Sequence, residues 1–392
     1  MNTLNPRPFL FLALSIILGQ LSAMADEDKV SEPSAEYLAV SENFVDSFNY
    51  GNSETIHEDI DLEAIIDTAL DGLPEGDGFR RGFKVGFLQS QEDFGEMFLA
   101  NFPADSTAKL IRWRKFGKGY NALVRIDGDS GLNYLDLFIR PNKAGKLKIV
   151  DMYQLHAGEP YTTSIRNLAA FATPNQSVTK MLLGQEKGLG KNANLLVDLL
   201  NDARSGDYDA FTKKYMKAND TVRSQKSACL AAYQIGTLDM EGELYPKALK
   251  DLKQFFGNEP GMALMMLDVY FAEEDYDSVL KCLNQIEKYS GGVPDAALLT
   301  LETNTRMVMK DYDGAIKSAQ NAIAIEPDYS DAYFSLGESQ IAGGKFDDAV
   351  ATLKIIGDKY FVTFDDYEFE EDPSYAKFVE SDAYKRWAKE NE

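Results

Sequence analysis

The chain contains only two histidines, His57 and His156, which restricts the acid–base chemistry that it can perform. His156 follows a predicted strand and precedes Ala157-Gly158-Glu159. A histidine acts as a general base when a pocket brings it within hydrogen-bonding reach of a substrate and a carboxylate orients it. His156 is therefore a candidate base only if the fold supplies both a pocket and a carboxylate. The alternative, which we expect, is a histidine that ends a strand.

Metal and cofactor chemistry has little support in the residue pattern. Cys and His do not cluster with the spacing that zinc requires. Asp127, Asp129 and Gly131 resemble part of a calcium loop, but the glycine comes one position early and no acidic residue closes the loop. We expect a hairpin turn there. The sequence also lacks a glycine-rich phosphate loop and a nucleophile elbow, so we expect no metal, no cofactor and no enzymatic activity.

The two cysteines, Cys229 and Cys282, are too few for a disulfide framework. We expect two small buried side chains, although a single disulfide would also suit an exported protein.

A motif of period four runs through Gly78-Phe79, Gly82-Phe83 and Gly86-Phe87. On a helix it forms a glycine stripe beside a phenylalanine stripe. Interspersed basic residues exclude a membrane-spanning glycine zipper. We expect a helix that packs closely on the sheet of its own domain.

The first 25 residues have the pattern of a secretory signal peptide. Arg7 is the only charge before Asp26, Phe9–Leu18 is apolar, and Ala23-Met24-Ala25 forms a small-x-small cleavage site. A membrane anchor needs about 20 apolar residues, so this run is too short. We expect a periplasmic or secreted protein whose mature form does not span a membrane.

The formal net charge is −23, and loss of Arg7 with the signal peptide would make it −24. Nucleic acids and anionic membrane surfaces are bound through basic patches. The composition therefore argues against both and favours neutral or basic partners.

Residues 26–175 predict an α+β domain. Apolar residues recur at helical spacing in 38–48, 62–70 and 79–98, with a break near Ser90. Four strands are predicted after these helices, at 110–114, 120–126, 132–139 and 147–155. Strands joined by turns as short as these pair in an antiparallel sheet. The order of elements is similar to that of the cystatin-like α+β rolls.

Helical patterns resume near Thr163, and an aromatic elbow recurs in them. The elbow residues are Tyr208, Tyr245, Tyr276, Tyr312 and Phe346, which lie 37, 31, 36 and 34 residues apart. Small residues at helical spacing allow two antiparallel helices to pack closely, and proline ends the second helix. The residues that define the last two copies are Tyr312, Ala315, Ala322, Pro327, Tyr333, Leu336, Gly337 and Ala349.

This pattern resembles the tetratricopeptide repeat, a unit of roughly 34 residues. The resemblance covers residues 193–358 and implies an all-α solenoid that binds proteins or peptides. In this family the first helix of each repeat lines the concave groove. The positions that the resemblance places on the groove are Thr300, Asn304, Met307, Phe334, Glu338 and Ile341.

These groove candidates suit an apolar or mildly basic peptide segment, because they combine aromatic, methionine and carboxylate side chains. The lysines with which some family members hold an acidic peptide end are missing at the matching places. Each candidate has an alternative role in packing.

The predicted organisation is a signal peptide (1–25), an α+β roll-like domain (26–175), helical repeats (176–358), and an acidic linker with a capping helix (359–392). The favoured function is a non-enzymatic scaffold or assembly factor that binds other proteins. The alternative is a small-ligand binder or enzyme that uses a pocket in the roll.

Overall fold

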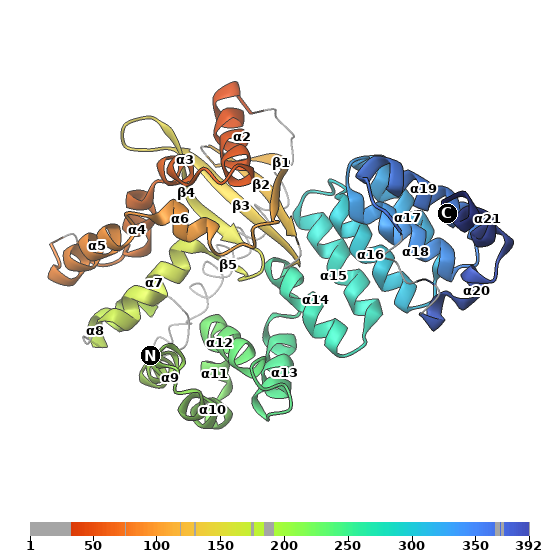
Figure 1. The fold of residues 1–392 in the computed structure, drawn as a ribbon. Coiled ribbons are helices and arrows are strands. Elements are labelled where there is room, and N and C mark those ends of the chain that lie inside the picture. The colour runs from red at the N-terminus through yellow and green to blue at the C-terminus, as the bar shows by residue number, and fades with distance from the viewer. Residues whose placement is uncertain are drawn as a thin grey trace, which may run out of the picture. The chain divides into compact units, whose positions relative to one another are not determined.

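A computed structural model describes residues 33–391 except 75, 118, 129–130, 174–175, 184–191, 365–368 and 370–371. The predicted signal peptide lies outside these described residues. The chain divides into two compact units (Figure 1). Of the described residues, the first unit contains those within 33–126, 134–153 and 160–165, and the second contains those within 127–133, 154–159 and 166–391.

The first unit begins with five helices. They are α2 (Ala35–Asn49), α3 (Ser53–Asp59), α4 (Leu62–Ala69), α5 (Gly78–Ser90) and α6 (Phe94–Leu99). The three predicted helical stretches are confirmed, and the break falls between Ser90 and Phe94 as expected. Helix α3 is additional to the prediction.

The five helices are followed by one sheet in which consecutive strands are neighbours, in the order β1-β2-β3-β4-β5. The strands are β1 (Thr107–Phe116), β2 (Gly119–Gly128), β3 (Gly131–Pro141), β4 (Leu147–Gln154) and the two-residue β5 (Glu159–Pro160). The predicted antiparallel meander and the α+β class are confirmed. The Asp127 segment connects β2 to β3, as expected for a hairpin, although residues 129–130 are outside the described part.

Hydrogen-bonding side chains and a buried aromatic side chain hold helix α2 against the first strand. The amide of Asn49 pairs with the backbone of Ala108 in both directions, at 3.0 and 2.7 Å. The indole of Trp113 donates to the hydroxyl of Ser41 at 2.9 Å. Phe44, on the same helix, is fully buried. Figure 1 shows α2 alongside β1 in this arrangement.

The expected close packing of the glycine stripe is wrong. Gly78, Gly82 and Gly86 lie on an exposed face of α5, and a Cβ atom added to any of them would meet nothing within 4 Å. The phenylalanines instead stack on one another along the helix, and of the three only Phe87 is buried. The period-four motif thus organises one face of α5 without bringing its glycines against the sheet.

The second unit is helical. It contains most of α7 (Tyr161–Ala172), then α8 (Gln176–Leu183), α9 (Ala193–Ser205), α10 (Tyr208–Lys217), α11 (Asp220–Arg223), α12 (Lys226–Gly236), α13 (Leu244–Phe256), α14 (Ala263–Ala272), α15 (Tyr276–Tyr289), α16 (Ala296–Val308), α17 (Tyr312–Ile325), α18 (Ser330–Ala342) and α19 (Phe346–Tyr360). From α12 onward the helices form consecutive antiparallel pairs. Within the described part of the chain, no helix is both long and apolar enough to cross a membrane.

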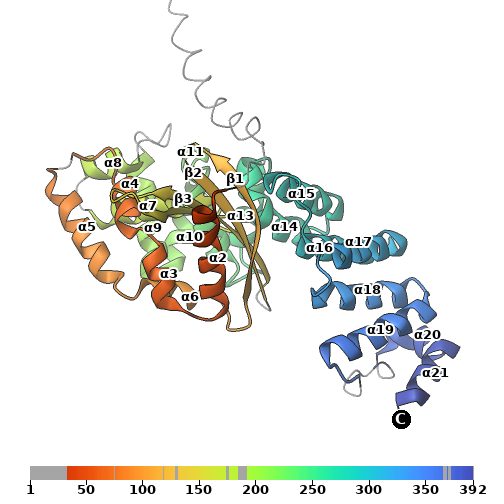
Figure 2. The same cartoon turned by 90° about the horizontal axis from the view of Figure 1, so that it is seen from above.

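Aromatic residues cover the last helix pair. After α19 come a short 3-10 turn (Pro373–Tyr375), α20 (Ala376–Val379) and α21 (Asp382–Asn391), which Figure 2 shows beside α19. Phe378, Tyr384 and Trp387 are buried in one cluster with Ile356 of α19. A solenoid needs a cover of this kind at its end, because the last repeat has no successor to bury its apolar face.

Candidate functional site

The aromatic elbows are helix starts. Asp207, Asp275 and Asp311 each precede an elbow tyrosine, and each carboxylate accepts a hydrogen bond from a backbone N–H in the first turn, at 3.1 to 3.2 Å. This is N-terminal capping, which stabilises a helix by about 1 kcal/mol. The Asp-Tyr sequence therefore fixes where α10, α15 and α17 begin, whereas α13 and α19 begin without a side-chain cap.

Gly337 of α18 faces α19 within the last helix pair. A Cβ atom there would lie 3.7 Å from Cγ2 of Thr352 and 4.0 Å from Cδ2 of Leu353, both on α19. The space beside Gly337 is therefore too small for a large side chain. The structure buries most of the repeat-defining residues, namely Ala315, Ala322, Tyr333, Leu336, Gly337 and Ala349. Tyr312 is half-buried, and Pro327 is exposed two residues after the end of α17.

The six groove candidates fall into two groups. Asn304 and Glu338 are exposed, and Met307 and Phe334 are half-buried. Thr300 and Ile341 are buried, with 6% and 7% of their surface accessible. The hydroxyl of Thr300 donates to the carbonyl of Ala296 within α16, at 2.9 Å. Ile341 belongs to the core cluster beneath the C-terminal cap.

Helices α16 and α18 present the accessible candidates side by side. The hydroxyl of Ser335 donates to Oδ1 of Asn304 at 3.1 Å, which joins the two helices at the candidate surface. Phe334 packs one side against the core cluster of the last repeat and leaves the other accessible. Thr300, Asn304, Phe334 and Glu338 line the same depression in the second unit.

Comparison with known proteins identifies the helix pairs. Residues 309–361 match the family model described as "Tetratricopeptide repeat". The chain carries a tetratricopeptide repeat. The predicted resemblance is thus confirmed, and α17, α18 and α19 account for the matched residues. The tetratricopeptide repeat is a fold that serves as a scaffold for protein binding.

Solved structures also match part of the chain. A crystal structure of MamA is 20% identical, covers 46% of this chain and 97% of its own, and has a TM-score of 0.34. The TPR2AB domain of yeast Sti1, solved as a "pHSP90-complex", is 16% identical, covers 56% of this chain and 91% of its own, and has a TM-score of 0.26. No curated protein matches the chain.

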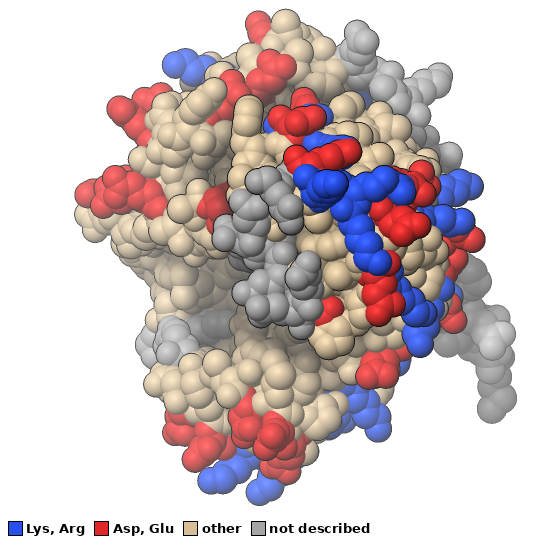
Figure 3. Space-filling model, turned by 45° about the vertical axis from the view of Figure 1, so that its right-hand side comes forward, with Lys and Arg blue, Asp and Glu red and all other residues tan. Residues whose placement is uncertain are grey.

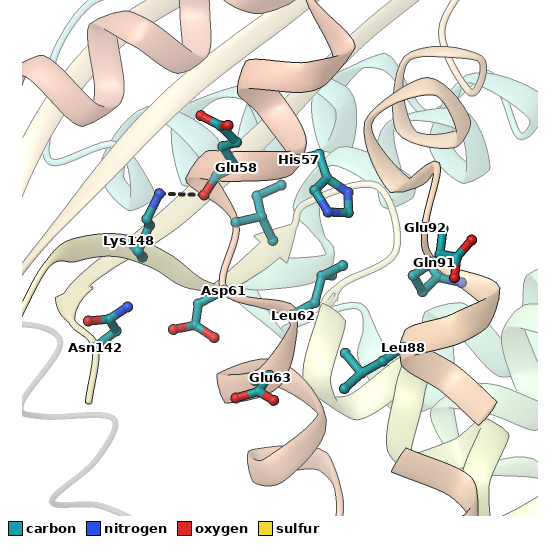
Figure 4. A pocket seen from close by; sticks show the side chains of 11 residues that line it. His57, Glu58, Asp61, Leu62, Glu63, Leu88, Gln91, Glu92, Asn142 and Lys148 are labelled. Carbon is teal, nitrogen blue, oxygen red and sulfur yellow. Dashed lines mark hydrogen bonds between the residues drawn. The ribbon is translucent and has the colours of Figure 1, made fainter. Parts of the chain in front are cut away.

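The first unit has a separate cavity of about 510 Å³, shown in Figure 4. His57, Leu62 and Leu88 point into it from α3, α4 and the end of α5. Among the described residues, Nδ1 of His57 is buried and has no hydrogen-bond partner. The side chain of Lys148 is bonded to the carbonyl of Glu58 and lies 3.8 Å from Asp59.

Acidic side chains dominate the rim of the His57 cavity. They are Glu58, Asp61, Glu63 and Glu92. The carboxylate of Asp61 caps α4 by accepting from the N–H of Ala64 at 2.8 Å. The described residues contain no group of three or more His, Cys, Asp or Glu side chains arranged to hold a metal ion.

His156 does not contribute to this cavity. It lies in the turn after β4 with an exposed side chain. The histidine that lines a pocket in the first unit is therefore His57, whose only signal in the sequence is its residue type. Its neighbours Leu62 and Leu88 come from other helices, so only the fold brings them together.

Proposed function

We propose that this protein is an exported, non-enzymatic scaffold that binds an extended protein segment on the face formed by α16 and α18. The observation that carries the proposal is the accessible set Asn304, Met307, Phe334 and Glu338 on two successive first helices. Half-buried aromatic side chains on a preformed surface are the usual anchors of protein interfaces. The two buried candidates, Thr300 and Ile341, are left out of the binding face.

The charge of the binding face indicates the charge of the partner segment that it suits. Asp331 and Glu338 line the depression, whereas the described residues that line it include no lysine or arginine. An apolar segment that carries one or two basic residues complements this surface. On the face drawn in Figure 3, basic side chains lie among acidic ones and do not gather into a broad basic patch, which is the feature that nucleic acid binding requires.

A peptide selection tests the binding face. We expect a random library displayed on phage to yield segments that combine large apolar residues with Lys or Arg. Phe334→Ala and Glu338→Lys should each weaken binding of a selected peptide by about tenfold or more. Asp358→Lys, which makes the same charge change on an exposed position of α19, is the matched control and should bind normally. Retained binding by both face variants would place the partner elsewhere.

Export and domain organisation belong to the same proposal. The support for export is the apolar run and the Ala23-Met24-Ala25 sequence, and a mature chain that begins at or near Asp26 is the expected product. N-terminal sequencing of the exported protein measures this directly. A retained Met1 in the membrane pellet would refute export in soluble form. Limited proteolysis that leaves a helical fragment of roughly residues 185–392 would support a domain boundary at 160–180.

A second candidate function is binding of a small molecule in the His57 cavity. The cavity is large enough for a metabolite, and an apolar floor beside carboxylates suits a cationic group. A thermal-shift screen with small amines tests this candidate. A rise in melting temperature that persists in His57→Ala and in Glu92→Gln would show that the amine binds at another place.

A further inference from the structure

A second depression lies within the repeats, at the junction between α15 and α16. It has a volume of about 210 Å³. Each helix contributes one face, because the lining positions recur every three to four residues. The lining residues are Leu280, Leu283, Asn284 and Glu287 of α15, and Pro294, Asp295, Leu298, Leu299, Glu302 and Arg306 at and within α16.

The cavity exists because this junction lacks the side chains that fill the next one. At the junction of α17 with α18, Ile323 and Tyr329 pack against a core of small alanines. Aligning the helix starts places Glu287 of α15 where α17 has Ile323. Aligning the start of α16 with that of α18 places Asp295 where Tyr329 precedes α18. Two large side chains are thus replaced by two carboxylates, of which Glu287 is half-buried and Asp295 is buried. Of the leucines behind them, Leu280 and Leu299 are half-buried. The other two, Leu283 and Leu298, are buried.

The size of the cavity matches one large side chain. A cavity of roughly 150 Å³ lined by apolar residues accommodates a benzene molecule, so this one has room for an aromatic ring or a large aliphatic group. Its lining has the composition of a protein-binding pocket, with leucines inside and polar groups at the edge. This junction has no tyrosine at the position that Tyr329 takes in the next one. The space therefore admits an aromatic side chain from outside.

The charges at the edge favour a basic neighbour for that side chain. Glu287 and Glu302 contribute two half-buried carboxylates, against the single guanidinium of Arg306. Asp295 is buried and caps α16 by accepting from the N–H of Ala297 at 2.8 Å. Arg306 is already bonded to Glu302 at 2.8 Å and to Asp311 at 2.7 Å. The edge therefore carries excess negative charge, which complements Lys or Arg.

We propose that the α15–α16 cavity is a side-chain pocket that takes one aromatic or large aliphatic residue of a partner protein, with Lys or Arg next to it in sequence. This inference rests on the proposed function, since it assigns a second, sequence-selective contact to the same scaffold. The pocket supplies specificity that the open face of α16 and α18 lacks, because a closed pocket rejects side chains by size.

Fluorescence anisotropy with three synthetic decapeptides of glycine and serine tests the pocket. Their central residues are Trp-Lys-Lys, Ala-Lys-Lys or Trp-Glu-Glu. We expect the first to bind the mature protein at least about tenfold more tightly than the other two. Glu287→Gln should reduce the preference for lysine over glutamate while leaving the preference for tryptophan over alanine.

Filling the cavity provides the decisive variant. Asn284→Phe adds a ring at an exposed position that lines the pocket, so binding of the Trp-Lys-Lys peptide should fall by about tenfold while circular dichroism stays unchanged. Gln320→Phe, at the corresponding exposed position of α17, is the matched control and should bind as the wild type does.

The outcomes separate this inference from the proposed function. Equal affinity for the tryptophan and alanine peptides, or normal binding by a folded Asn284→Phe protein, overturns the pocket. If binding of Trp-Lys-Lys is then lost in Phe334→Ala, the scaffold function stands and only the pocket is wrong. If neither the decapeptides nor the displayed library yields any binder, both proposals fail.

Discussion

The hydroxyl of Tyr215 on α10 donates a hydrogen bond to the carboxylate of Asp251 on α13, with 3.0 Å between the two oxygens. Both residues are fully buried. Lys247 pairs with the same carboxylate, and Arg223 lies 3.6 Å from it. A buried carboxylate is stable only when it has partners of this kind. This network ties one helix pair of the second unit to the next.

Removing either member of the Tyr215–Asp251 pair should destabilise the second unit to different extents. Tyr215→Phe loses one hydrogen bond to a charged group, and we expect a cost of about 1.5–3 kcal/mol. Asp251→Ala also removes the carboxylate with which Lys247 pairs and leaves Arg223 with Asp220 alone, so about 3–5 kcal/mol is expected. Urea unfolding measures both changes. Two equal losses below about 0.5 kcal/mol would show that the network carries no stability.

Two glycines should respond oppositely to a methyl group. A Cβ atom on Gly236 would lie 2.8 Å from Cα of Tyr245, a backbone atom of the neighbouring helix that cannot yield locally. Gly236→Ala should therefore cost about 1–3 kcal/mol. Gly337 has 3.7 Å to its nearest neighbour, so Gly337→Ala should be neutral or should stabilise by up to about 1 kcal/mol through helix propensity.

Thermal unfolding of the two alanine variants measures this contrast. Gly337→Leu adds a third point, because the larger side chain would meet Thr352 and Leu353 and should cost about 1–3 kcal/mol. If Gly337→Ala proves as damaging as Gly236→Ala, the close approach of α18 and α19 is tighter than the structure indicates.

The parts of the fold that could be predicted are those encoded by neighbouring residues. The turn around Asp127 and the capping aspartates Asp275 and Asp311 act within a few residues of themselves, so their outcome needs no tertiary information. Helix α3 escaped prediction because six of its seven residues are polar, only Ile56 is buried, and no apolar period is present. Such a helix forms because its neighbours cover it.

Contacts between distant segments set the limits of prediction. The repeat resemblance places Thr300 and Ile341 on the groove, but it does not reveal that both side chains are buried. The glycine stripe of α5 was expected to pack, and only the structure shows that its face is open. Likewise, the α15–α16 cavity could not be predicted, because the side chains that line it come from two different helices.

Asp151 should make stability depend on pH. It is buried, and Thr162 donates to it from its hydroxyl at 2.7 Å and from its N–H at 3.1 Å. Burial raises the pKa of Asp151 above its usual range, and these hydrogen bonds offset the shift only in part. The folded protein therefore retains a proton that the unfolded chain, with a pKa of about 3.9, has already released.

The sign of the effect follows from that difference in bound protons. The stability that Asp151 contributes to the folded state is fully present below about pH 4. It is lost as the pH rises through the raised pKa that Asp151 has in the folded protein. Asp151→Asn does not titrate, so its stability relative to the wild type should improve as the pH is raised from 3.5 to 7. Urea unfolding across that range provides the measurement. A constant difference between the two proteins would mean that Asp151 does not titrate differently on folding.

The two cysteines should be unreactive thiols in the folded protein. Cys229 and Cys282 are both free and buried. Burial raises the pKa of Cys229 to about 12 and that of Cys282 to about 11. Because the thiolate is the reactive form, Ellman's reagent at pH 8 should detect no thiol in the native protein and two per chain in guanidinium. A denatured, unreduced chain that yields no thiol would reveal a disulfide formed on export, which the separate burial of these two side chains argues against. Rapid labelling of the native protein would instead show that the repeats open locally around α12 or α15.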